Sequence, residues 1–126
     1  MPKTIKIVSW NLGYWQYRKQ HANAWQYLRD VVKPDIGLLQ EVSIPDMDKD
    51  ECVIFRKVHQ DWGTAIYCRG AIGIREITMQ RYSERVAAAE VALESEKSLF
   101  IASIHAPIIN GRVFPHMDNC EPTVHP

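Results

Sequence analysis

Short apolar runs bounded by turn residues or charge clusters dominate the sequence, and only one segment repeats its apolar residues at helical spacing. The runs occupy residues 3–11, 35–42, 51–58, 62–70, 71–82, 84–95 and 97–106. Short runs of this kind, several of them rich in β-branched or aromatic residues, are typical of strands. Because the last five follow one another without a helix between them, they predict a largely antiparallel sheet.

The helical segment covers residues 19–35, KQHANAWQYLRDVVKPD. Pro34 supplies its stop, because proline cannot continue a helix. The residues that recur at helical spacing are Ala24, Trp25, Leu28, Val31 and Val32. The opening of the chain therefore reads strand, helix, strand. Run 84–95 is rich in alanine and glutamate, which favour helices, but its short length and the turn expected at 95–97 favour a strand.

The composition is that of one globular domain. The chain has 126 residues, of which 46% are hydrophobic, and its formal net charge is zero. We assign residues 1–118 to the domain and 119–126 to an irregular tail. Three cysteines without metal-ligand spacing predict free thiols in a reducing compartment. No signal peptide and no membrane-spanning run is recognisable, so a cytoplasmic protein is expected.

Two polar residues stand at the ends of strand-like runs. Asn11 is the last residue of the first run, and Glu41 lies near the end of the second. If these strands are parallel, their carboxyl ends lie side by side, where α/β proteins bind ligands. A carboxylate there suits Mg²⁺, which prefers oxygen ligands and keeps several waters. The alternative is that Asn11 caps the next segment and Glu41 is a solvated strand end.

Further candidates lie in the loops beside these strand ends. His105 ends the last run, where a neutral imidazole can transfer a proton or donate to a phosphoryl oxygen, although a satisfied surface histidine is the alternative. Tyr14 and Trp15 lie in the loop after Asn11 and are candidate substrate contacts. Asn110 and Arg112 follow His105, and Arg112 is either a phosphate contact or a solvated arginine. Gly63, at the start of run 62–70, predicts a close backbone approach or a bulge.

Four stretches in this order, IVSWNLGYW, LLQEV, WGTAIYCR and IASIHAPI, resemble the endonuclease/exonuclease/phosphatase superfamily, whose members include deoxyribonuclease I. The resemblance implies a four-layer α/β sandwich and hydrolysis of phosphoester bonds with Mg²⁺ or Mn²⁺. It implies that Glu41 binds the metal, that Asn11 holds a phosphate oxygen or water, and that His105 assists proton transfer at the phosphate.

The resemblance also has a limit. The family's later Gly-Asp-x-Asn segment and its terminal Ser-Asp-His segment do not occur in these 126 residues. We therefore expect about half of the family's domain: one mixed, largely antiparallel sheet with a flanking helix, and an apolar face left for self-association.

The function expected is a metal-dependent phosphoesterase acting on a phosphodiester or phosphomonoester. The alternative is an inactive relative that retains weak metal or phosphate binding or serves as an interaction module. The substrate class stays open, because nucleic acid remains a candidate although zero net charge does not favour it.

Overall fold

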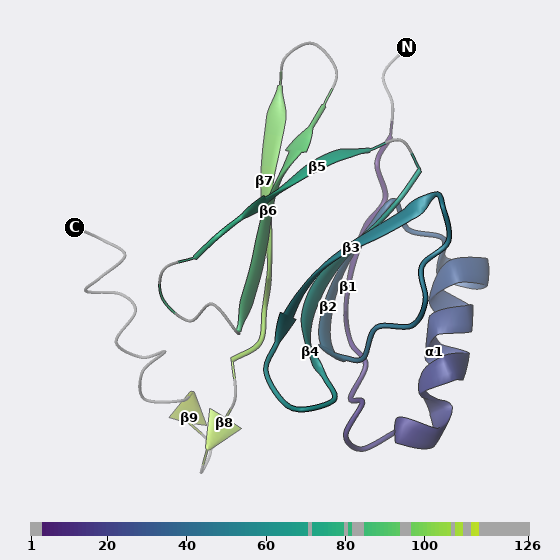
Figure 1. Ribbon diagram of the computed structural model, residues 1–126, viewed down its shortest axis with the longest axis vertical. Coiled ribbons are helices and arrows are strands. Elements are labelled where there is room, and N and C mark those ends of the chain that lie inside the picture. Colours follow the sequence, from purple (N-terminus) through teal and green to yellow (C-terminus); the bar gives the residue numbers. More distant parts are fainter. Residues whose placement is uncertain are drawn as a thin grey trace.

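The described residues form one helical segment and a series of strands (Figure 1). The computed structural model describes residues 4–70, 72–79, 81, 85–93, 97–106, 108–109 and 112–113. The helical segment consists of η1 (Arg18–Gln20), α1 (His21–Tyr27) and η2 (Leu28–Val32). The strands are β1 (Ile7–Asn11), β2 (Ile36–Val42), β3 (Glu51–Lys57), β4 (Gly63–Arg69), β5 (Gly73–Ile77), β6 (Val86–Ala92), β7 (Ser98–Ile104), β8 (Ile108–Ile109) and β9 (Arg112–Val113).

The strands divide between two main sheets, which corrects the expected single sheet. The first sheet has the order β1-β2-β4-β3, and the second has the order β5-β6-β7. Among the described strands, only β1 and β2 are parallel, as the strand–helix–strand opening indicated, and the other pairs are antiparallel. The mixed α/β class is confirmed. The division arises after β4, where Gly70 has a φ of 81° and the chain continues into a strand that pairs only with β6.

The predicted helix is confirmed, with one difference in its last turn. Trp25 and Leu28 are buried, but Val31 is exposed although helical spacing placed it on the apolar face. The reason is a π-turn, in which the Lys33 N–H donates to the Leu28 carbonyl oxygen over 2.9 Å. This wider turn rotates Val31 outward. Lys33 ends the segment in the left-handed conformation, directly before Pro34.

Two apolar cores give the domain three layers: helix, first sheet and second sheet (Figure 1). The helix packs Trp25 and Leu28 on one face of the first sheet, against residues that include Leu39 and Tyr67. The opposite face packs on the second sheet through Ile36, Ile66, Cys68, Ala87, Ala89 and Val91. Strand β4 is covered on both faces, which explains why its sequence is almost continuously apolar.

The second sheet thus covers the face that was expected to be free. Exposed apolar side chains lie instead on β7, where Phe100 is 66% and Ile104 is 53% exposed. Self-association through an apolar sheet face stays a prediction. Among the described residues, no helix has the length and apolar character needed to cross a membrane. The turn expected at 95–97 lies partly, and the tail at 119–126 entirely, outside the described residues.

Candidate functional site

Asn11 and Glu41 lie at adjacent strand ends. Asn11 is paired in register with Gln40 in the parallel β1–β2 ladder. Beyond the ladder, the Tyr14 N–H donates to the Glu41 carbonyl oxygen over 2.9 Å. These backbone contacts hold the loop after β1 against the end of β2. The side-by-side placement predicted for the two residues is confirmed.

A bulge near the end of β2 sets the direction of Glu41. The β2–β4 register shifts between Leu39 and Val42, and Glu41 has a φ of 49°. This left-handed conformation is uncommon for a residue other than glycine, and such backbone strain concentrates at functional sites. The bulge breaks the alternation of side chains, so Leu39 and Val42 both join the core beneath the helix.

The Glu41 carboxylate accepts hydrogen bonds from three side chains. Asn11 Nδ2 donates to Oε2 over 2.9 Å, and the Trp15 indole Nε1–H donates to Oε1. His105 Nε2 lies 3.2 Å from the same Oε2 as Asn11. The side chains of Glu41 and His105 are 15% and 11% exposed, so the pair is largely shielded from water. Asn11, Glu41 and His105, predicted as site residues, therefore meet at one carboxylate.

A tight turn after β1 orients the Asn11 amide. Its Oδ1 accepts a hydrogen bond from the Gly13 N–H over 2.9 Å, so Nδ2 is directed to Glu41. Gly13 has a φ of 60°, a conformation that glycine adopts without strain. The Asn11 oxygen therefore makes the local contact that the alternative interpretation expected, while its nitrogen donates to Glu41.

His105 reaches Glu41 from the second sheet. It directly follows β7, and its backbone N–H donates to the Arg85 carbonyl oxygen over 2.9 Å. The Trp62 ring meets the imidazole edge-on, with ring centroids 5.4 Å apart. His105 Nδ1 is buried and has no hydrogen-bond partner among the described residues. The ring is thus fixed by packing on one side and by Glu41 at Nε2.

A polar bridge between the two sheets lies next to this site. Gln40 Nε2 donates to Ser103 Oγ over 2.8 Å, and Ser103 Oγ donates to the Leu39 carbonyl oxygen over 2.8 Å. Ser103 is buried, and it stands two residues before His105 on the same strand. The bridge was not predicted from the sequence, and neither was the contact of Trp62 with the site, whereas Trp15 lies in the loop that was expected to contact substrate. Side chains alternate between the two faces of a strand, so Ser103 and His105, two residues apart, lie on the same face. This alternation is the feature of the sequence that could have indicated that Ser103 lies near the site.

The other candidates are not brought to the carboxylate in the described part of the chain. The Tyr14 ring packs edge-on against His21 at 4.7 Å, and the Arg18 guanidinium lies 5.4 Å from the Tyr14 ring centroid. Arg112 belongs to strand β9, where only the backbone is described, and Asn110 lies outside the described residues. Among the residues the structure describes, no group of three or more His, Cys, Asp or Glu side chains could hold a metal ion.

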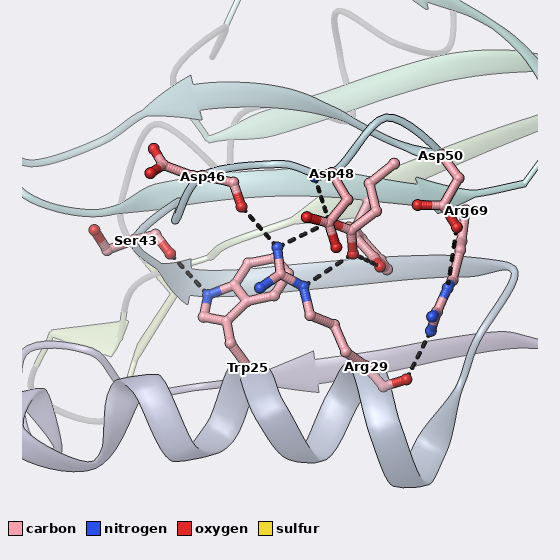
Figure 2. A network of polar contacts seen from close by, with 9 residues as sticks. Trp25, Arg29, Ser43, Asp46, Asp48, Asp50 and Arg69 are labelled. Atoms are coloured by element: carbon pink, nitrogen blue, oxygen red, sulfur yellow. Dashed lines mark hydrogen bonds and ion pairs between the residues drawn. The ribbon is translucent and has the colours of Figure 1, made fainter.

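A second polar cluster, between the helix and the first sheet, fixes the scaffold (Figure 2). Arg29 donates through Nε and Nη2 to the two oxygens of Glu51, each over 2.9 Å, and the Tyr67 hydroxyl also donates to Glu51. Burial alone would raise the pKa of Glu51, but hydrogen bonds from the Asp48 N–H, Tyr67 and Arg29 together lower it. Burial and the Glu51 carboxylate raise the pKa of Tyr67.

Figure 2 shows Trp25 and Arg29 extending from the helix toward the segment that follows β2. Trp25 Nε1 donates to the Ser43 carbonyl oxygen, and Arg29 Nη2 donates to that of Asp46. These bonds hold the helix against the segment immediately after Glu41. The cluster therefore supports the site without contacting its carboxylate.

Comparison with known proteins adds no assignment, since neither a family model nor a curated protein matches the sequence.

Proposed function

We propose that the protein is a divalent-metal-dependent phosphoesterase of the endonuclease/exonuclease/phosphatase type, with its reacting centre at Glu41. The observation that carries the proposal is the meeting of Asn11, Glu41 and His105 at one shielded carboxylate. These are the three residues singled out by the motifs, and they come from three different strand ends on two sheets. Such convergence of separated polar residues is typical of catalytic sites.

The donor set is compatible with one divalent cation at Glu41. A carboxylate has about four acceptor positions, of which three are used by Asn11, Trp15 and His105. Mg²⁺ is commonly held by one or two carboxylates together with waters and substrate phosphates. Glu41 would hold the ion, which when bound supplies a positive charge that polarises a phosphoryl oxygen.

The side chains around Glu41 have separable roles in this proposal. Asn11 Nδ2 is the amide donor that would bind a phosphate oxygen once Glu41 engages a cation. His105 Nε2, now facing Glu41, is the nitrogen that would exchange a proton with the substrate. Trp62 and the low exposure of the pair limit access of water to that nitrogen.

One observation favours a second function, metal and phosphate binding without turnover. Within the described residues, no further acidic side chain joins Glu41. A single carboxylate anchors a cation weakly, and the described part of the chain places no second carboxylate beside it to activate water. The two functions differ in turnover, although both place the cation at Glu41.

Hydrolysis of bis(p-nitrophenyl) phosphate by residues 1–126 with Mg²⁺ or Mn²⁺ tests the proposal. We expect a metal-dependent rate that falls at least about tenfold in Glu41→Gln, because the substitution removes the anionic ligand. Asp30→Asn, which neutralises an exposed carboxylate on the helix, is the matched control and should leave the rate unchanged. Equal rates for wild type and Glu41→Gln would contradict the enzyme proposal.

Mn²⁺ binding, followed by electron paramagnetic resonance, separates the two functions. Binding that is lost in Glu41→Gln, without any turnover by the wild type, would support the binding function. Absence of Mn²⁺ binding to the wild type would overturn both. In the enzyme case, His105→Ala is expected to abolish turnover while Mn²⁺ binding persists, because the imidazole serves proton transfer rather than the cation.

A further inference from the structure

Two cysteines face each other across the β3–β4 ladder. Cys52 lies on β3, at the edge of the first sheet, and it is paired directly in register with Cys68 on β4. Residues directly opposite each other in an antiparallel pair project to the same face. The next pair on that face is Ile54 and Ile66, which belongs to the core between the sheets. Cys68 therefore belongs to that core, and Cys52 lies beside it at the exposed edge of the sheet.

The register already satisfies the main geometric requirement of a disulfide. Directly opposed residues in an antiparallel ladder have Cα atoms about 4.5–5.5 Å apart. A disulfide spans Cα separations of about 4.4–6.8 Å. The two thiols are free, and they are neighbours across the ladder. The register therefore places the two Cα atoms within the range that a disulfide spans.

The two thiols differ in access to solvent. Cys52 is exposed, whereas Cys68 is 1% exposed. Burial, and then the neighbouring Cys52, raise the pKa of the Cys68 thiol to about 12, so that it is protonated at neutral pH. An oxidant in solution therefore meets Cys52 first, and Cys68 is held beside it as the second thiol.

We propose that Cys52 and Cys68 form an oxidative modification site that a peroxide converts into a cross-strand disulfide. The Cys52 sulfur attacks one peroxide oxygen, the O–O bond breaks, and Cys52 sulfenic acid and water are formed. The Cys68 sulfur then attacks the Cys52 sulfur, the S–O bond breaks, and the Cys68 proton passes to the leaving hydroxyl, which departs as a second water. Two thiols and one hydrogen peroxide thus give one disulfide and two waters.

This bond would fasten the edge strand β3 to the central strand β4. An edge strand has a neighbour on one side only and is among the first elements to open locally. At its other end the same hairpin carries Trp62, which contacts His105. Oxidation would therefore stabilise the hairpin that packs against the candidate site. The site of modification stands on its own, because nothing in it depends on phosphoesterase activity.

The test uses the full chain carrying Cys120→Ser, which leaves Cys52 and Cys68 as its two cysteines. The protein is treated with a slight excess of hydrogen peroxide and studied by intact mass, thiol titration and peptide mapping. We expect the loss of two hydrogen atoms, no titratable thiol, a Cys52–Cys68 linked peptide, and a Tm at least about 4 °C higher. Retained thiols, a disulfide between two molecules, or overoxidation of Cys52 would overturn the proposal.

Single variants test the order of events. In Cys68→Ser, Cys52 sulfenic acid should persist and be labelled by dimedone, because the second thiol is missing. Cys68→Ala serves the same purpose if the buried serine impairs folding. In Cys52→Ser the remaining Cys68 should resist peroxide over the same time. Equal oxidation of Cys68 in that variant would contradict the role of Cys52 as the thiol that reacts first.

Discussion

A Glu51→Leu variant is expected to lose about 3 kcal/mol of unfolding free energy, because it leaves the charge of Arg29 without its partner. Glu51 is buried, and its carboxylate accepts from Arg29, Tyr67 and the Asp48 N–H. The variant loses all of these bonds at once. Urea unfolding at pH 7, followed by circular dichroism, measures the change.

Glu76→Leu is the matched control for this prediction. Glu76 also pairs with an arginine, Arg56 at 2.5 Å, but its side chain is 41% exposed. Exposed ion pairs contribute little, so we expect a change within about 1 kcal/mol. A loss in Glu76→Leu equal to that in Glu51→Leu would show that burial of the Glu51 cluster is not what stabilises the helix on the sheet.

The Glu51 cluster also predicts how stability depends on pH. Because folding lowers the pKa of Glu51, its contribution is complete above the unfolded-state value of about 4.3. The contribution is lost as pH falls through the folded-state pKa. The stability difference between wild type and Glu51→Leu should therefore shrink below about pH 4. A difference that stays constant from pH 7 to pH 3 would contradict the assignment.

Gly63→Ala is expected to destabilise the fold by at least about 3 kcal/mol or to prevent folding. A Cβ atom at Gly63 would lie 2.1 Å from the Arg56 carbonyl oxygen and 2.9 Å from the Lys57 Cα. Both are backbone atoms of the paired strand β3, so neither can move without breaking the ladder. The close approach predicted from the sequence is thereby confirmed. Yield of soluble protein and thermal unfolding measure the effect.

Gly73→Ala controls for the general cost of replacing a strand glycine. Its Cβ would lie 3.4 Å from the Ala92 Cβ, an ordinary van der Waals contact. We expect a change within about 1 kcal/mol, since alanine fits an exposed strand position. A loss of stability in Gly63→Ala as small as that in Gly73→Ala would contradict the prediction. It would show that the β3–β4 hairpin can shift its backbone to accept a Cβ atom at residue 63.

Local patterns were sufficient to predict the elements and one part of the site. Helical spacing identified the segment around Trp25, and the strand–helix–strand opening placed Asn11 beside Glu41 in a parallel pair. Both predictions use only the pattern of residues close together in the sequence and the geometry of a single strand–helix–strand connection. The π-turn that exposes Val31 was not predictable, because the spacing of Val31 from the other apolar residues agrees with an ordinary α-helix.

The remaining features depend on contacts between the sheets. Short apolar runs predict strands but not their partners, so the division into two sheets was missed. The contact of His105 with Glu41 requires that β7 packs across β2, and the Gln40–Ser103 bridge has the same requirement. The left-handed conformation of Glu41 had no sequence signal either, because glutamate rarely adopts it.

The division of Glu41 and His105 between two sheets links the site to folding cooperativity. Their 3.2 Å contact exists only while the two sheets pack against each other. A partial unfolding step that separates the sheets but leaves each of them intact would therefore already break the contact. The buried Gln40–Ser103 bridge beside it opposes such an opening, because separation would strip two polar groups of their partners. The candidate site therefore exists only in the assembled tertiary structure. We expect the contact between Glu41 and His105 to be lost when the two sheets separate, before either sheet unfolds.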